Sequence, residues 1–192
     1  MATLMIDRFL AAAPAESRAA YEKRWRSIVQ EHADFIWRAL RRLGVLEADL
    51  EDAAQQVFLV LARKLSDVRS GAERKFLFQT AFRVASDSRR TRRRQREVPD
   101  DHLALHTDER PRPDEDMEAR LRRAQLDRIL DLMPMELRAV FVLSELEEMT
   151  MAEIAAMTGT RPGTVASRLR RARAAFNGQV ALLHKTERQA GS

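Results

Sequence analysis

The chain has 192 residues, a net charge of +5 and an isoelectric point near 10.3. Its 45% hydrophobic content excludes a globally disordered chain, and its basic charge favours an anionic partner without choosing between nucleic acid and membrane. The lack of cysteine excludes disulfides, thiolate catalysis and cysteine zinc sites, and no apolar run is long enough to span a bilayer, so we expect a cytoplasmic protein.

Few glycines, few prolines and almost no β-branched runs predict an all-α fold. Two apolar, periodic blocks separated by a polar stretch predict two small helical domains joined by a flexible linker. Residues 1–20 are expected to form an N-terminal extension, because Asp7 and Arg8 interrupt the apolar run that a signal peptide would need. Tyr21 to Leu43 is the first predicted helix, in which apolar residues recur at three- and four-residue steps until Gly44 ends it.

A second helix is predicted from Asp49, as its N-cap, to about Leu65. Its inner face is apolar. Its other face is acidic and rich in amides, which stands out in a basic protein, and it has a leucine in its middle. An exposed leucine among polar groups is typical of a protein contact, although periodicity alone favours an ordinary solvated face. This acidic-and-amide face comprises Asp49, Glu51, Asp52, Gln55, Gln56 and Leu59.

Residues 66–75 form a loop by composition, with Ser70 and Gly71 at its centre, and the third predicted helix spans Phe76 to Arg96. The outward face of this helix combines aromatic and basic side chains. Such a face suits single-stranded DNA, because rings stack on unpaired bases and arginines hold the backbone. Packing of Phe76 and Phe82 on a neighbouring helix is equally compatible with their spacing. The face comprises Lys75, Phe76, Gln79, Phe82, Arg83, Ser86, Asp87 and Arg90.

The charge changes sign abruptly after the third helix. Arg89 to Arg96 is almost entirely arginine and should add phosphate contacts that weaken with salt. Residues 97–118 are acidic and interrupted by prolines, so we interpret them as an interdomain linker. His102 and His106 are spaced as metal ligands on a helix, but the flanking prolines argue against a rigid helix there, and we assign no metal.

The second domain is predicted over residues 119–178, with 179–192 as a helical continuation and a frayed tail. Two supporting helices are expected at Ala119 to Leu132 and Glu136 to Leu146. The first is anchored by Leu121, Leu126, Ile129 and Leu130, and the second by Leu137, Val140, Phe141 and Leu143.

The stretch from Thr150 to Phe176 has the layout of a helix-turn-helix. Thr150 and Glu153 form a capping box, Gly159 supplies the positive φ of a tight turn, and Pro162 begins the next helix. Opposite an apolar stripe, that helix presents small residues and then arginines, which suits the major groove. A solvated arginine face on an ordinary helical hairpin is the alternative. The candidate DNA contacts are Arg161, Thr164, Ser167, Arg168, Arg170, Arg171 and Arg173.

These motifs, in this order, resemble the sigma-70 family of transcription initiation factors, especially the small extracytoplasmic-function group. The resemblance covers Tyr21 to Phe176. In the family's fourth conserved region the matching residues are Pro134, Arg138, Val140, Phe141, Leu143, Glu153-Ile154-Ala155, Gly163-Thr164-Val165, Ser167-Arg168-Leu169 and Arg171-Ala172-Arg173. In its second region they are Asp49 to Phe58 and Phe76 to Arg90. The departures are Met133 for Leu, Gln56 for Glu, Phe76 for Trp, Arg83 for Asn and Ala166 for Lys.

The resemblance implies that the acidic-and-amide face docks on core RNA polymerase, whose clamp helices of the largest subunit and flap are the contact points. It also implies that residues 21–96 recognise and melt the −10 element, with a flipped base held by the loop at 66–75. The helix-turn-helix domain would bind the −35 major groove. Implied partners are the core enzyme, promoter DNA in double-stranded and melted form, and an anti-sigma factor, which family members commonly have. No cofactor and no small-molecule substrate is implied.

The expected function is therefore that of a sigma factor, which binds core RNA polymerase and directs promoter recognition and −10 melting for bacterial transcription initiation. A stand-alone helix-turn-helix regulator is the alternative, and it leaves the acidic-and-amide face unexplained. A basic helical RNA-binding or scaffold protein is a third reading. We expect no enzyme, because the sequence offers no metal set, nucleophile–base pair or phosphate-binding glycine loop.

Overall fold

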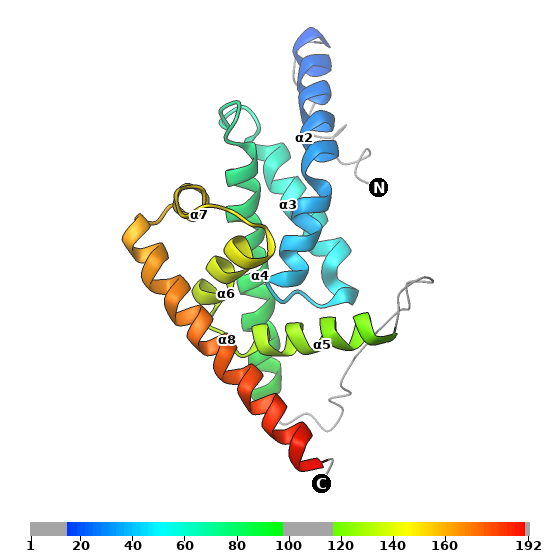
Figure 1. Cartoon of the computed structure of the whole chain (residues 1–192). Coiled ribbons are helices and arrows are strands. Elements are labelled where there is room, and N and C mark those ends of the chain that lie inside the picture. Colours follow the sequence, from blue (N-terminus) through cyan, green and yellow to red (C-terminus); the bar gives the residue numbers. More distant parts are fainter. Residues whose placement is uncertain (1–14, 98–116, 191–192) are drawn as a thin grey trace. The chain divides into compact units, whose positions relative to one another are not determined.

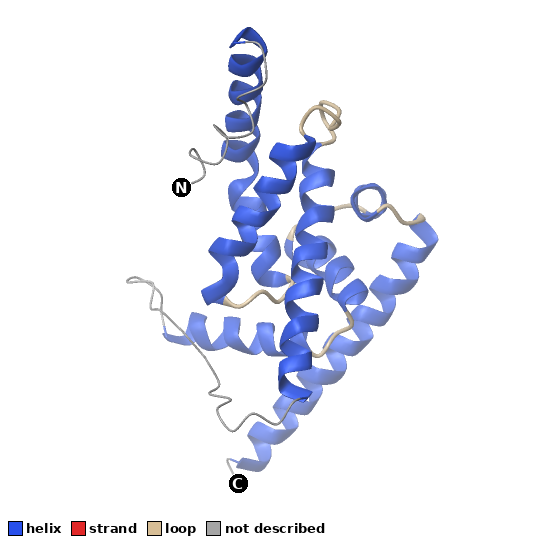
Figure 2. Cartoon of the chain, turned by 180° about the vertical axis from the view of Figure 1, so that it is seen from behind, coloured by secondary structure: helices blue, strands red, loops and turns tan. Residues whose placement is uncertain are grey.

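The computed structural model describes residues 15–97 and 117–190. Most of the predicted N-terminal extension and of the acidic linker, with His102 and His106, lies outside the described residues. Within those two ranges all regular structure is helical, as expected for an all-α protein (Figure 2). The chain separates into two compact units. Unit 1 is Met1–Arg41 with Val45–Arg90, and unit 2 is Arg42–Gly44 with Thr91–Ser192. None of the helices described is both long and apolar enough to cross a bilayer.

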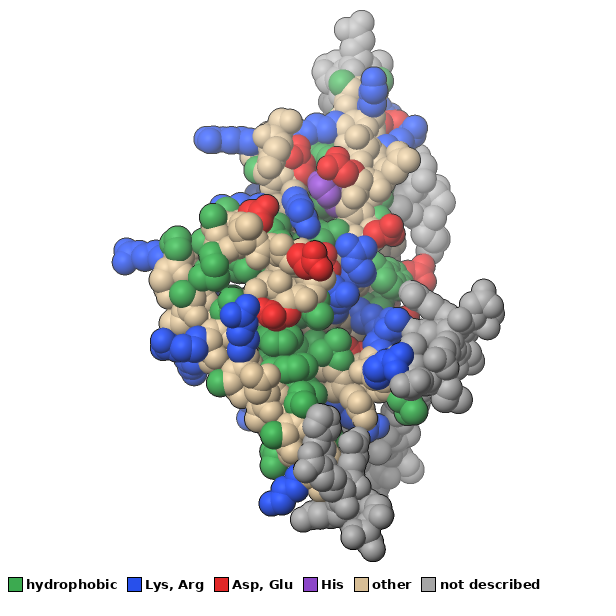
Figure 3. Space-filling model, viewed as in Figure 1, with side chains coloured by type: hydrophobic (Ala, Val, Ile, Leu, Met, Phe, Trp, Pro, Cys, Tyr) green, Lys and Arg blue, Asp and Glu red, His purple; other side chains and the backbone are tan. Residues whose placement is uncertain are grey.

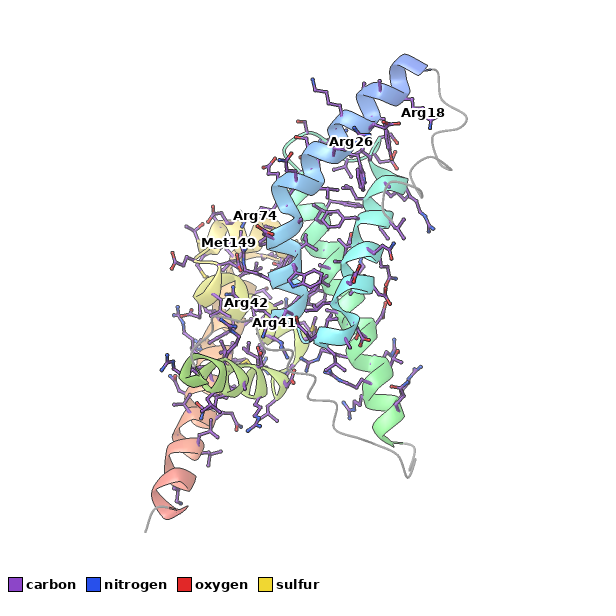
Figure 4. All side chains as sticks on the ribbon, turned by 90° about the vertical axis from the view of Figure 1, so that its right-hand side faces the viewer. Arg18, Arg26, Arg41, Arg42, Arg74 and Met149 are labelled. Atoms are coloured by element: carbon purple, nitrogen blue, oxygen red, sulfur yellow. The ribbon has the colours of Figure 1, made fainter. Side chains whose placement is uncertain are left out.

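Unit 1 is built on three long helices, α2 (Ala15–Arg42), α3 (Leu50–Lys64) and α4 (Glu73–Glu97), with the short helix η1 (Glu47–Asp49) before α3 (Figure 1). Apolar side chains from all three helices form its core. The Phe35 ring on α2 lies against the Phe78 ring on α4, with 6.3 Å between ring centroids. The guanidinium of Arg74 covers the Phe35 ring at 4.4 Å from its centroid, so a cation–π contact closes the edge of this core (Figure 4).

Three features of unit 1 differ from the sequence prediction. Helix α2 begins at Ala15 instead of Tyr21, where Arg18 pairs with Glu22 one turn further on. Helix α4 begins at Glu73 instead of Phe76, so the preceding loop is shorter than predicted. An acidic residue in the first turn favours this earlier start, because it complements the positive end of the helix dipole. Phe78, which was not predicted to face inward, is 1% exposed.

Unit 2 contains α5 (Met117–Asp131), α6 (Met135–Phe141), the π-helix η2 (Val142–Leu146), α7 (Met151–Thr158) and α8 (Pro162–Ala190). Its core joins α5, α6, η2 and α8, and the rings of Phe141 and Phe176 stack with 4.9 Å between centroids. The buried core cluster comprises Ile129, Leu130, Met133, Leu137, Phe141, Val142 and Ala172, with Leu126, Leu146, Phe176 and Val180 packed against it.

Two predictions for unit 2 need correction. Leu121 was expected to anchor the first supporting helix, but it is 58% exposed, because only the later part of α5 from Leu126 packs on the core. The second supporting helix is not a uniform α-helix, since it widens into a π turn at Val142. The predicted helical continuation after residue 178 is confirmed, because α8 runs unbroken to Ala190.

Candidate functional site

The helix-turn-helix of unit 2 has the local geometry that the sequence predicts. Thr150 Oγ1 accepts a hydrogen bond from the Glu153 amide at 3.3 Å, and the Thr150 amide donates to Glu153 Oε2 at 2.7 Å, which completes the capping box. Gly159 ends α7 with φ of 67°, and Pro162 opens α8. Short-range chemistry therefore fixes the start of α7 and the turn into α8.

Helix α8 sorts into a buried and an exposed face. Val165, Leu169 and Ala172 are buried against the unit, and Phe176 is half-buried at the next position of the same stripe. Basic side chains gather along the outer edge of α8 (Figure 3). Among the predicted DNA-contacting residues, two are half-buried, Thr164 and Arg168. The other five are exposed: Arg161, Ser167, Arg170, Arg171 and Arg173.

One arginine of this face already has a partner in the chain. The guanidinium of Arg173 donates from Nε and Nη2 to Glu145 Oε1 of η2, at 3.0 and 2.7 Å. Hydrogen bonding from Arg173 holds the pKa of Glu145 below its usual value, and this effect outweighs the partial burial of the carboxyl, which acts in the opposite direction. Arg173 is therefore oriented by Glu145 in the free chain. Sequence reasoning missed this pair, because 28 residues separate the two groups.

The acidic-and-amide face lies on the side of α3 opposite its buried residues Leu50, Ala53, Val57 and Leu61. Asp49 occupies the N-cap position as predicted, but its side chain makes no capping hydrogen bond. The leucine of the face is half-buried, so it presents part of its side chain rather than all of it. The exposed members of the face are Asp49, Glu51, Asp52 and Gln56, and the half-buried ones are Gln55 and Leu59.

The aromatic and basic face of α4 is also divided by exposure. Phe76 and Phe82 are both half-buried, so part of each side chain is accessible to solvent. Ser86 Oγ donates to the carbonyl of Phe82 at 2.7 Å, which ties this hydroxyl to its own helix. The exposed residues are Lys75, Arg83, Asp87 and Arg90, and the half-buried ones are Phe76, Gln79, Phe82 and Ser86.

Two residues of α2 that sequence reasoning did not select bond the last turn of α3 and the segment between α3 and α4. Tyr21 Oη donates to the carbonyl of Ala62, and Arg24 donates to the carbonyls of Leu65 and Val68. No sequence signal marks these contacts, since their acceptors are backbone oxygens more than 40 residues away. No group of three or more His, Asp or Glu side chains that could hold a metal ion occurs in the part of the chain that the structure describes.

The chain has two helical units, and one of them contains a capped helix-turn-helix whose second helix has an exposed face rich in arginine. This is the architecture of a DNA-binding protein. Residues 123–176 match the family described as Sigma-70, region 4. The ECF RNA polymerase sigma factor SigE of Mycolicibacterium smegmatis is 31% identical over 151 residues, which are 78% of this chain and 58% of SigE. The RNA polymerase sigma factor NccH of Alcaligenes xylosoxydans xylosoxydans is 30% identical over 154 residues, which are 77% of this chain and 81% of NccH.

Two solved structures share the fold. CnrH, solved in complex with the cytosolic domain of CnrY, superposes with a TM-score of 0.62 at 22% identity, over 95% of this chain and 99% of CnrH. The sigma factor RpoE, solved with the anti-sigma factor NepR from Bartonella quintana, gives 0.62 at 18% identity, over 83% of this chain and 98% of RpoE. The chain belongs to the RNA polymerase sigma factors, in the extracytoplasmic-function group. Membership in this family indicates a factor that directs transcription initiation, and argues against the stand-alone regulator.

Proposed function

We propose that the chain binds core RNA polymerase and carries it to a defined set of promoters, where it recognises two elements and helps to melt one of them. The chain matches only 58% of the length of SigE. We therefore base this proposal on the residues of this chain and not on the activity of SigE as a whole. The observation that carries it is the capped helix-turn-helix with its exposed arginine face, lying within the residues that match region 4. We assign residues 21–96 to region 2, 97–118 to the linker and 119–178 to region 4.

The polymerase contact in this proposal is the acidic-and-amide face of α3. Its carboxylates are exposed in a chain whose overall charge is +5, so they are available to a basic partner surface. Leu59 lies among them and gives the face an apolar centre, as in interfaces whose buried centre carries most of the binding energy. We place this face against the clamp helices of the largest polymerase subunit. The flap of the core enzyme is a further proposed contact of the chain.

The proposed −10 contact is the outward face of α4. Exposed Lys75, Arg83 and Arg90 can hold phosphates, and Phe76 and Phe82, which are half-buried, can offer ring surface on which unpaired bases stack. Stacking is possible only after a base leaves the duplex, so these contacts favour the melted state. They offset the cost of unpairing, which is a few kcal/mol per base, without any catalytic step by the chain itself.

The proposed −35 contact is the exposed face of α8. Thr164 and Ser167 lie near its N-terminal end, where a recognition helix meets base edges, and the arginines follow. Ser167 Oγ donates to the Thr164 carbonyl at 3.0 Å, which leaves its oxygen able to accept from a base or a water. We further propose an anti-sigma protein as a partner, as NepR is for RpoE. We also propose that the chain acts in the cytoplasm beside the polymerase.

The proposal is tested by separating the two kinds of contact. The double substitution Leu59→Glu with Gln55→Ala should abolish binding to purified core polymerase and leave binding to −35 duplex DNA unchanged. The matched control is Arg63→Gln on the same helix, an exposed residue outside the face. Transcription in vitro from a genomic library, with core enzyme and the full chain, supplies the promoters. If the wild-type chain starts no transcript and binds no core enzyme, the stand-alone regulator becomes the better reading.

A further inference from the structure

We propose that Arg24, from helix α2, is a positioning residue that sets the shape of the loop between α3 and α4 for reading one base of the −10 element. The inference rests on the proposed function, which places the −10 contact on the outward face of α4, and it extends that contact to the preceding loop, which the resemblance implies holds a flipped base. Arg24 lies outside both proposed DNA-contacting faces, so it would act on DNA only by holding the backbone of the loop.

The guanidinium of Arg24 joins three consecutive segments of unit 1. Its Nη1 donates to the Leu65 carbonyl at 3.1 Å, and its Nη2 donates to the Val68 carbonyl at 2.6 Å. The same Nη2 pairs with Glu73 Oε1 at 3.0 Å. The end of α3, the middle of the loop and the start of α4 are therefore fastened to one side chain of α2.

These contacts lie close to helix ends, where charged groups are favourable, and the Leu65 carbonyl also accepts a hydrogen bond from the Val68 amide at 3.3 Å. The last carbonyls of an α-helix lack partners within the helix, and a positive charge near them is favourable. Arg24 supplies both at the end of α3, while Tyr21 bonds the carbonyl of Ala62 three residues before Leu65. At the other side of the loop, Glu73 lies in the first turn of α4, where a negative charge is favourable.

The loop is thus fixed at its base and presented at its tip. Leu65 and Val68 are buried, whereas Arg69, Ser70 and Gly71 are exposed. Gly71 has φ of 84°, and the Ala72 amide bonds the Arg69 carbonyl at 3.0 Å, so a tight turn forms the tip. This exposed turn directly precedes the DNA-contacting face of α4, which begins at Lys75.

Arginine fits this role better than lysine. Its planar fork reaches two carbonyls and one carboxylate at once, whereas a lysine ammonium is a single point charge. The side chain of Arg24 is 35% exposed and that of Glu73 is 12% exposed, so the pair is partly shielded from solvent. Partial burial raises the pKa of Glu73. The hydrogen bonds from Arg24 and from nearby backbone amides together lower it by more, so the pKa of this carboxyl lies below its usual value.

The test uses the full chain assembled with core polymerase and a pool of single-stranded DNA 12-mers of random sequence. Sequencing of the bound fraction gives the preferred bases, and fluorescence anisotropy gives the affinity for one selected oligonucleotide. Variants are Arg24→Gln and Arg24→Lys. The matched control is Arg26→Gln on the same helix (Figure 4). The Arg26 side chain is 68% exposed and pairs with Glu22 one turn away.

Arg24→Gln should lower affinity for the selected oligonucleotide about tenfold, because the loop must then be ordered on binding. It should also flatten the base preference at one position, and leave core binding and −35 duplex binding unchanged. Arg24→Lys should fall between wild type and Arg24→Gln, and Arg26→Gln should match wild type. Binding is measured well below the unfolding midpoint of each variant. That midpoint is determined from the fluorescence of Trp25 and Trp37, which both lie in unit 1. If Arg24→Gln does not fold, Arg24→Lys carries the comparison.

An unaltered base preference in a folded Arg24 variant that still binds core enzyme would overturn the inference and leave the proposed function in place. A wild-type holoenzyme that selects no bases from the pool would instead overturn the proposed −10 contact, and the role of Arg24 with it.

Discussion

Glu148 has φ of 53°, in the left-handed region that residues with a side chain seldom occupy. It follows the π-helix η2, where the Glu147 amide bonds the Val142 carbonyl at 3.0 Å and the Met149 amide bonds the Leu143 carbonyl at 2.9 Å. The left-handed residue lets the chain turn back after η2 and reach Thr150, the first residue of the helix-turn-helix. Most helices place glycine at such a position.

We expect Glu148→Gly to raise the free energy of unfolding by about 0.5–1 kcal/mol. The left-handed conformation costs a residue with a Cβ about 1–2 kcal/mol, and glycine's larger loss of chain entropy offsets part of that gain. Glu148→Ala is the control, because it removes the same carboxylate and keeps the Cβ. Urea unfolding followed by circular dichroism measures both. An equal gain in the two variants would mean that charge, and not backbone conformation, is responsible.

Thr150 gives a second residue-scale prediction. Thr150→Ala should lower the free energy of unfolding by about 1 kcal/mol, because the Glu153 amide at the start of α7 loses its side-chain acceptor. Glu153→Gln should cost less, since the glutamine oxygen can still accept from the Thr150 amide. Urea unfolding again supplies the numbers. Equal costs for the two substitutions would show that the carboxylate charge of Glu153 contributes as much as the hydrogen bond that Thr150 accepts.

Residues governed by local chemistry were predictable from the sequence, and residues governed by distant partners were not. The capping box at Thr150, the positive φ of Gly159 and the buried stripe of α8 follow from neighbours within a few positions. Arg24 acts on carbonyls that only the fold brings near it. Glu148 was also missed, because a glutamate gives no signal for a left-handed turn.

At the scale of elements, the ion pair between Glu145 of η2 and Arg173 of α8 should make the stability of α8 depend on pH. Glu145 has a pKa lowered by Arg173, so it binds fewer protons in the folded chain than in the unfolded one at mildly acidic pH. The stabilisation from this pair is therefore fully present above about pH 4.3, the usual value for glutamate, and is lost as the pH falls through the lower folded-state pKa.

Arg173→Gln should accordingly destabilise the chain at pH 7 by a few tenths to about 1 kcal/mol, because the pair is partly exposed. That difference from wild type should disappear at a pH below the folded-state pKa of Glu145. Unfolding midpoints in urea at several pH values test this. Arg171→Gln removes the same charge two residues away and should show no such convergence. A constant loss at every pH would exclude an electrostatic role for the pair.

The elements themselves were largely predictable, and their ends were not. The predicted helices of both units are present, because apolar spacing reports which face packs on a core. The π turn at Val142 and the exposure of Leu121 depend on how α5, α6 and α8 meet, and no periodicity reports that. The predicted binding faces lie on solvated sides of α3, α4 and α8, but their roles remain predictions that the binding experiments must test.

At the scale of the whole molecule, the two units carry separate parts of the proposed promoter contact. The −10 face belongs to α4 of unit 1, and the −35 face belongs to α8 of unit 2. The two faces share no residue and would read different promoter elements. The free energy of promoter binding should then be the sum of independent contributions from the −10 contact and the −35 contact.

This independence is measurable with a double-mutant cycle on the holoenzyme. Arg83→Ala weakens the −10 contact, and Ser167→Ala combined with Arg171→Ala weakens the −35 contact. The −35 change should cost about 1–3 kcal/mol in promoter binding if it removes a base contact, and Arg83→Ala should weaken promoter binding through the loss of a phosphate contact. The triple variant should lose the sum of the two, within about 0.5 kcal/mol, because the sites share no partners. Equilibrium binding to one promoter from the genomic selection, at fixed salt, gives all four values. A loss clearly smaller than the sum would mean that one contact forms only after the other, so that recognition proceeds in order instead of in parallel.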